Sequence, residues 1–289
     1  MNPTPFGKRL AEWRERRRES QLGLALAAGV SQRHISFMES GRAQPSREMI
    51  VRLSDVLDIP LRARNELLTA AGFASLYGER PLVDVELQAA FGALQRIIVH
   101  QEPYPAFVID RAWRIVMHNR AAASLMAGCF NEAALVALAS DGGVNFMRMM
   151  FEPAQMRPRI RNWSSVGPRL LQRLRREAAG DDQSPSAILL RELLTVPDDA
   201  LGTADDAGSL PPTLDVEMNV ASTTLRFFNT ITTFGTPQDV GLQELRIEMS
   251  FPADAATETF FKKAAEIQSS LDMKPGDVGA QGRFGQNRT

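Results

Sequence analysis

The sequence has 289 residues, of which 44% are hydrophobic and 23% charged. This composition indicates about two globular domains and excludes collagen-like, wholly disordered and disulfide-scaffold chains. One cysteine and three histidines fit no multi-ligand zinc pattern, so we expect no metal and no cofactor, and Cys129 is interpreted as a buried structural residue. No apolar run reaches the ~18 residues that a membrane helix needs, and MNPTPFGKRL lacks the apolar segment of a secretory signal. We therefore expect a cytoplasmic protein with no membrane partner.

Charge is unevenly distributed along the chain, although the formal net charge is only -1. Residues 1–52 contain 10 basic and 5 acidic side chains, so the rest of the chain carries the opposite excess. The most acidic stretch, residues 181–251, has 3 basic and 12 acidic side chains. A solvated surface explains such runs as well as a nucleic-acid partner does, so a motif is also required.

Helix signals follow one another through the first 72 residues. Thr4, Ser20 and Ser31 are suitable N-caps, and Gly29 is suited to end the second helix. The expected helices span about residues 5–18, 20–28, 32–40, 46–57 and 61–71. Two short helices joined by a tight glycine-containing turn form a helix-turn-helix, so we expect an all-α bundle of five helices.

The stretch SQLGLALAAGVSQRHISFMESGRAQPS (residues 20–46) resembles the Xre/Cro-type helix-turn-helix. Ala25 stands where two helices cross, and Ile35 stands at the buried position of the recognition helix. In that family an arginine of the first helix pairs with a glutamate that ends the third. Arg14 and Glu39 match those positions, so the resemblance implies a structural ion pair between them.

The helix after Ser31 has the side chains that read base edges in the major groove. Gln32 suits adenine, Arg33 suits guanine, and Gln21 begins a helix whose free amides suit a phosphate. The candidate DNA-contacting residues are Gln21, Ser31, Gln32, Arg33, His34, Ser36, Phe37, Arg42 and Gln44. The alternative is an exposed polar face without a partner, and Phe37 either contacts a base or packs.

The second predicted helix also departs from the family pattern. Gly23 lowers helix propensity by roughly 1 kcal/mol relative to alanine. Leu22 and Leu26 add an apolar strip, which packs against another part of the chain or against a second subunit.

The rest of the chain predicts a helix leading out of the bundle and then an α+β layer. The segment PAFVIDRAWRIVMHNRAAASLM indicates two strands, turning at Asp110-Arg111, and then a helix; it resembles the start of a PAS domain. The expected elements are a linking helix at 82–100, helices at 157–178, 187–195 and 254–270, a loop at 197–212, strands at 213–220, 224–234 and 242–251, and a mobile tail. Strands at both ends with helices between them predict an antiparallel sheet covered on one face.

Five stretches together resemble the MmyB-like family of bacterial regulators: SGRAQPSREM, PLRARNELLTAAGFA, EPYPAFVIDR, PRIRNW and NTITTFGTPQDVGLQELRIE. The resemblance covers about residues 5–254. It implies a one-component transcription factor that joins an Xre-type headpiece to a PAS-like ligand-binding domain. The implied divisions are the DNA-binding domain 1–79, a linker helix 80–104, the ligand-binding domain 105–254, and a C-terminal helix and mobile tail 255–289.

The ligand-binding domain is rich in methionine and aromatic residues, which adapt to apolar ligands such as a fatty-acyl chain. The candidate ligand residues are Met147, Phe151, Arg159, Asn162, Trp163, Phe228, Ile247 and Met249, with the polar members suited to a carboxylate head group. The alternative is that the apolar members are simply core and the polar ones face solvent.

The preferred function is a homodimeric regulator that binds a double-stranded DNA operator and is nucleoid-associated when bound. Its small-molecule effector is expected to act by shifting the arrangement of the helix at 82–100. The alternative is an enzyme acting on a small metabolite, fused to a helix-turn-helix for autoregulation; a protein-interaction role ranks third. Because no catalytic motif is present, we expect no enzymatic activity.

Overall fold

The computed structural model describes residues 4–80, 84–139, 143–154, 156–179, 181–195, 215–235 and 237–272. The chain divides into two compact units, one formed by Met1–Leu94 with Thr232–Arg246 and the other by Gln95–Ile231 with Ile247–Thr289. The predicted loop at 197–212 and the predicted mobile tail lie outside the described residues.

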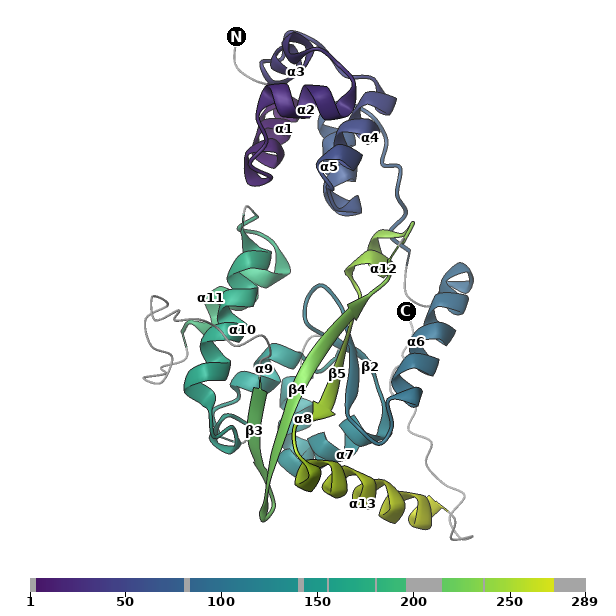
Figure 1. Ribbon diagram of the computed structural model, residues 1–289, viewed down its shortest axis with the longest axis vertical. Helices are drawn as coiled ribbons and strands as arrows, with labels where there is room; N and C mark the ends of the chain where they lie inside the picture. Colours follow the sequence, from purple (N-terminus) through teal and green to yellow (C-terminus); the bar gives the residue numbers. More distant parts are fainter. Residues whose placement is uncertain are drawn as a thin grey trace. The chain divides into compact units, whose positions relative to one another are not determined.

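The first unit contains the five predicted helices, which we call the headpiece (Figure 1). They are α1 (Pro5–Arg16), α2 (Gln21–Ala28), α3 (Gln32–Glu39), α4 (Arg47–Val56) and α5 (Leu61–Ala70). Thr4, Ser20, Ser31 and Ser46 each accept a hydrogen bond from a first-turn amide with the side-chain oxygen, as N-caps do. Gly29 ends α2 in the left-handed conformation (φ 65°), which a residue without a Cβ adopts at no steric cost.

The headpiece has its own hydrophobic core. Its fully buried members come from all five helices and include Leu10, Leu24, Ile35, Ile50 and Leu68. At the crossing of α1 and α3, a Cβ on Gly7 would lie 2.3 Å from the carbonyl oxygen of Glu39. Only glycine therefore allows these two helices to approach so closely.

The second unit is built on a five-stranded sheet with the order β2-β1-β5-β4-β3. The strands are β1 (Ala106–Ile109), β2 (Ile115–His118), β3 (Asp215–Val220), β4 (Thr223–Thr233) and β5 (Arg246–Pro252). β1 pairs antiparallel with β2, and β3 pairs antiparallel with β4. The expected α+β class with an antiparallel sheet is confirmed.

Helices make up most of the rest of the described chain. A 3-10 turn, η1 (Val85–Leu87), precedes α6 (Gln88–His100), and η2 (Arg157–Arg159) precedes α10. The other helices are α7 (Arg120–Cys129), α8 (Glu132–Leu138), α9 (Phe146–Phe151), α10 (Trp163–Ala178), α11 (Pro185–Leu193), α12 (Val240–Glu244) and α13 (Ala255–Asp272). Among the described helices, no single one is long and apolar enough to cross a membrane, although the bent pair α7 and α8 passes that test by length and composition.

The core of the second unit gathers around Trp113, which is fully buried. Its indole N–H donates to Glu177 at 2.9 Å, Phe146 stacks on it at 6.3 Å, and the guanidinium of Arg173 lies 4.6 Å from its ring. Cys129 is buried, as expected. Burial raises the pKa of the Cys129 thiol.

Two predicted boundaries are wrong. The helix expected from Arg157 is interrupted, because Ile160 forms a β-bridge with Met218 and the side chain of Asn162 bonds the backbone of β3. The strand expected to begin at Leu242 is preceded by α12, so β5 starts only at Arg246.

Candidate DNA-reading face and ligand cavity

The recognition helix α3 buries one face and exposes the other. Ser31 caps it, with its Oγ accepting from the backbone N–H of His34 at 3.2 Å. Ile35 and Met38 are fully buried in the headpiece core. Gln32 and Arg33, in the first turn, are exposed. The side chains predicted to reach base edges are therefore accessible on the headpiece.

The ring of Phe37 contacts the guanidinium groups of two of the predicted arginines. The guanidinium of Arg33 is 4.9 Å from the ring centroid, and that of Arg42 is 5.8 Å from it. Both distances fall within the range of cation–π attraction. Phe37 thus packs, as one of its two predicted roles required, and it restricts the positions of both cations.

Gln21 belongs to a partly buried polar network. Its amide nitrogen donates to Oε2 of Glu39 at 2.7 Å, and Arg14 donates to the same carboxylate through Nε at 2.7 Å and Nη2 at 3.1 Å. The hydrogen bond with Glu39 raises the pKa of Arg14. The ion pair implied by the family resemblance is confirmed, and it fixes Gln21 at the N-terminus of α2.

Other headpiece arginines are paired with carboxylates away from α3. Arg9 pairs with Glu66, Arg17 with Asp58, and Arg64 with Asp55. Within the part of the chain that the structure describes, Arg33 and Arg42 make no ion pair. Their charge is therefore available to a phosphate or a base edge.

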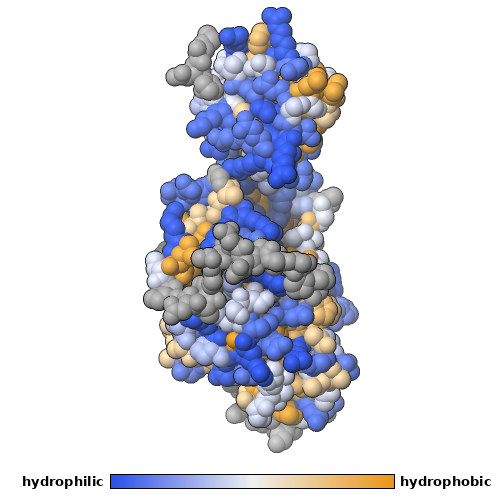
Figure 2. Space-filling model, turned by 60° about the vertical axis from the view of Figure 1, so that its left-hand side comes forward, coloured by the Kyte–Doolittle hydropathy of each residue, from blue (hydrophilic) through white to orange (hydrophobic). Residues whose placement is uncertain are grey.

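The remaining candidates differ in their exposure to solvent. Ser31 and Gln44 are exposed, whereas His34 and Ser36 are half-buried. The apolar strip on α2 is also exposed, with Leu22 at 51% and Leu26 at 73%. On the headpiece face seen in Figure 2, hydrophilic side chains predominate and hydrophobic ones gather at one edge.

Of the eight predicted ligand residues, Met147, Phe151 and Trp163 belong to the core of the second unit. Met147, Phe151, Trp163 and Ile247 are buried, and Phe151 contacts Trp163 edge to face at 4.9 Å. Phe228 stacks on Phe251 at 5.6 Å, and Met249 is half-buried.

The two polar candidates, Asn162 and Arg159, differ in their hydrogen bonding. Asn162 donates to the backbone oxygen of Asp215 at 2.8 Å and accepts from the amide of Glu217 at 3.0 Å. The buried Nε of Arg159 has no hydrogen-bond partner among the described residues. Asn162 therefore has a structural task, while Arg159 retains an unused donor.

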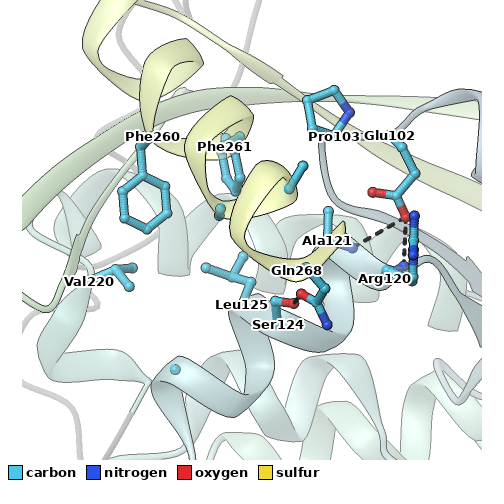
Figure 3. A pocket seen from close by; sticks show the side chains of 13 residues that line it. Glu102, Pro103, Arg120, Ala121, Ser124, Leu125, Val220, Phe260, Phe261 and Gln268 are labelled. Carbon is cyan, nitrogen blue, oxygen red and sulfur yellow. Dashed lines mark hydrogen bonds between the residues drawn. The ribbon is translucent and has the colours of Figure 1, made fainter. Parts of the chain in front are cut away.

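A cavity of about 220 Å³ lies between α7 and α13, and none of the eight predicted residues lines it. Figure 3 shows Val220 and Phe260 at one end of it and Glu102 with Arg120 at the other. Glu102 accepts from the backbone amide of Arg120 at 2.7 Å, and Ser124 donates to Gln268 at 2.6 Å. The cavity thus has an apolar interior and a hydrogen-bonded polar rim.

Small residues leave this space open. Ala121 and Gly128 line it from α7, and Ala264 and Ala265 line it from α13. In the sequence these residues are indistinguishable from ordinary helix-forming positions. Only the packing of α13 on α7, more than a hundred residues away along the chain, brings them together.

Comparison with known protein families assigns both parts of the chain. The model of the MmyB-like transcription regulator ligand binding domain matches residues 92–264, which is more than half of the sequence. The chain belongs to the MmyB-like transcription regulators. A helix-turn-helix model matches residues 10–63, which include α2 and α3. This MmyB-like protein is thus a regulator with a DNA-binding headpiece and a ligand-binding domain.

Similar proteins of known structure add no further assignment. The restriction-modification controller protein C.AhdI from Aeromonas hydrophila is 33% identical over 21% of this chain and 92% of its own, with a TM-score of 0.21. An RNA-binding Light-Oxygen-Voltage receptor is 12% identical over 91% of this chain and 65% of its own, with a TM-score of 0.25. No curated protein matches the chain.

Proposed function

We propose that this MmyB-like protein is a one-component regulator whose ligand-binding domain binds a small lipophilic molecule and thereby changes the affinity of the headpiece for a DNA operator. The observation that carries the proposal is the exposed first turn of α3, on a headpiece joined to a ligand-binding domain. The nine residues predicted from the sequence form its DNA-contacting set. Gln32 and Arg33 read bases, and the amides at the start of α2 bind a phosphate.

The effector occupies the cavity between α7 and α13. Leu125, Val220, Phe260 and Phe261 offer it apolar surface, while the polar rim favours a molecule with one polar end. A fatty-acyl chain has this character. None of the eight residues that the sequence predicted to contact the ligand lines this cavity.

The protein acts as a homodimer in the bacterial cytoplasm and is nucleoid-associated when it binds its operator. A single helix-turn-helix contacts few phosphates, so two headpieces on half-sites about 10 bp apart supply the affinity that a genome demands. The functional divisions are those expected from the sequence: 1–79 for DNA, 80–104 as linker, 105–254 for the effector, and 255–289 for the C-terminal helix and tail.

The effector proposal is tested by mass spectrometry of small molecules extracted from the purified full-length protein. Ala264→Leu places a larger side chain in the cavity, and Ala256→Leu, at an exposed position of the same helix, is its matched control. We expect a lipophilic molecule to co-purify with the natural protein and the control but not with Ala264→Leu. Equal amounts from all three proteins would place the ligand elsewhere.

The regulatory part is tested with a duplex enriched from a random-sequence library by the full-length protein. Saturated fatty acids of increasing chain length are the probes. We expect at least one of them to change the dissociation constant of the duplex about fivefold or more, the lower end of typical coupling between sites. An affinity that no probe changes would contradict acyl-responsive regulation.

A further inference from the structure

The turn between β4 and β5 makes a set of polar contacts with the headpiece. This docking turn, residues 237–246, contains α12 and belongs to the same compact unit as the headpiece. It nevertheless connects two strands of the ligand-binding domain sheet. Three groups of contacts hold the docking turn: a helix cap, an ion-pair network, and hydrogen bonds to the segment that follows α5.

The first contact caps α5. Pro60 is the N-cap residue of this helix and has no side-chain acceptor, so α5 lacks the local cap that Thr4, Ser20, Ser31 and Ser46 give the other headpiece helices. Instead, Oε1 of Gln243 accepts from the backbone N–H of Leu61 at 2.7 Å. The docking turn thus completes a headpiece helix from 182 residues away.

The second contact is an ion-pair network centred on Arg62. Arg62 donates to Glu244 in a bidentate manner, with distances of 2.7 and 2.9 Å, and also donates to Glu79. The hydrogen bonds to Glu244, and then those to Glu79, raise the pKa of Arg62. Arg62 and Glu244 are 26% and 21% exposed, so this fork is better shielded than the surface pair of Arg9 and Glu66, at 48% and 44%.

The third contact joins the docking turn to the segment that leaves α5. Asp239 is buried; one oxygen accepts from the amide of Leu242 at 3.2 Å and the other from that of Arg80 at 3.2 Å. Val240 donates its backbone N–H to the carbonyl of Gly78 at 2.8 Å, within a parallel β-bridge. Asn65 of α5 holds the same segment through Leu76 and Tyr77.

We infer that the docking turn is the element through which the state of the ligand-binding domain reaches the headpiece, in addition to the covalent linker. This inference rests on the proposed function and specifies the element that transmits a change in the ligand-binding domain to the headpiece. β4 and β5 are neighbours in the sheet, so a change in the ligand-binding domain that shifts their ends moves the turn. The turn caps α5, and α5 packs on α1 and α4 in the headpiece core. Since coupling between sites is reciprocal, DNA bound by α3 must also affect β4 and β5.

Reciprocity gives a test that needs no effector. Hydrogen exchange of the full-length protein is followed by mass spectrometry, with and without the duplex enriched by that protein from a random library. The readout is the exchange of residues 223–231 and 247–252, which are strand residues outside the headpiece unit. In the natural protein we expect the duplex to change their exchange rates about fivefold or more.

Glu244→Gln and Gln243→Ala each remove one contact of the docking turn and leave α3 untouched. Both should bind the duplex, yet the effect of the duplex on the two strands should be at least twofold smaller, because the docking turn is held less firmly while the covalent linker remains. Glu66→Gln is the matched control, because it breaks the ion pair of α5 with Arg9 and touches no residue of the docking turn. It should behave like the natural protein.

The outcomes separate the two proposals. If no duplex is enriched, the proposed function fails and the coupling fails with it. If the duplex binds but strand exchange is unchanged in the natural protein, only the coupling is overturned. It is equally overturned if the duplex effect is undiminished in both Glu244→Gln and Gln243→Ala.

Discussion

At the scale of single residues, the proposed DNA-reading face depends on side chains that hold other side chains in place. Phe37 restricts Arg33 and Arg42 through its ring, and Glu39 binds Arg14 and Gln21 at once. The sequence identified all of these positions as candidates or as a pair. It gave no signal for the arrangement of both guanidinium groups around one ring, because cation–π contacts depend on rotamers rather than on spacing.

Phe37→Ala should weaken duplex binding even if Phe37 touches no base. An exposed cation–π contact contributes about 0.5–1 kcal/mol, so releasing two arginines should raise the dissociation constant about fivefold. Phe37→Tyr keeps the ring and should bind within about twofold of the natural protein. Titration of a labelled duplex measures both. Equal binding by Phe37→Ala would show that the stacking does not organise these cations.

Gln21 and Gln32 should respond differently to the same substitution. Gln32→Ala removes a base-reading group, so it should cost about 1–3 kcal/mol on the preferred duplex and relax the choice at one base position. Gln21→Ala should weaken binding to all sequences alike, because it acts at a phosphate. Enrichment from a random library distinguishes them. A change of base preference in Gln21→Ala, or its absence in Gln32→Ala, would reverse the assignment.

The thiol of Cys129 should make the stability of the folded protein depend on pH. Burial raises the pKa of its thiol above the ordinary value of 9.0, so the folded state holds the proton more tightly than the unfolded state. The thiol therefore favours folding less and less as the pH rises past the pKa of the unfolded chain. Denaturant unfolding across this pH range should show a steeper loss of stability in the natural protein than in Cys129→Ala. Parallel curves would contradict the burial argument.

At the scale of elements, the sequence predicted what is encoded locally. The caps Thr4, Ser20 and Ser31 and the left-handed Gly29 are short-range signals, and α1, α2 and α3 were predicted from them. The start of α10 and the presence of α12 were not predicted. Both depend on distant partners: Asn162 bonds β3, and Asp239, which caps α12, also bonds Arg80. The α7–α13 cavity and the cap of α5 by Gln243 also depend on residues far apart in the sequence, so they were not predicted either.

Replacing two helical glycines by alanine should change the stability of the protein in opposite directions. At Gly7 a Cβ would collide with backbone atoms of α3, whereas at Gly92 of α6 nothing lies within 4 Å. Gly7→Ala should destabilise the headpiece by about 1–3 kcal/mol, as overpacking does. Gly92→Ala should stabilise by about 0.5–1 kcal/mol, because alanine loses less entropy in a helix. Thermal unfolding of the two full-length variants compares them. Equal shifts would disprove the close crossing of α1 and α3.

At the scale of the whole molecule, two functions share one chain and each has its own core. The basic excess of residues 1–52 coincides with the headpiece, where Arg9, Arg14, Arg17 and Arg64 are paired with carboxylates. The chain passes between the two compact units more than once: within α6 between Leu94 and Gln95, within β4 between Ile231 and Thr232, and between Arg246 and Ile247. The docking turn is therefore a second covalent connection between the sheet and the unit that contains the headpiece.

Above all, we propose that the first turn of α3 reads bases in duplex DNA. In the enriched duplex, each guanine is replaced in turn by 7-deazaguanine, which lacks the N7 acceptor that an arginine fork uses. The natural protein should lose about tenfold in affinity or more at one guanine, and Arg33→Ala, already weaker, should be indifferent to that replacement. If the natural protein and Arg33→Ala respond alike at every guanine, α3 does not read the sequence through Arg33. The proposed base-reading role of its first turn is then contradicted.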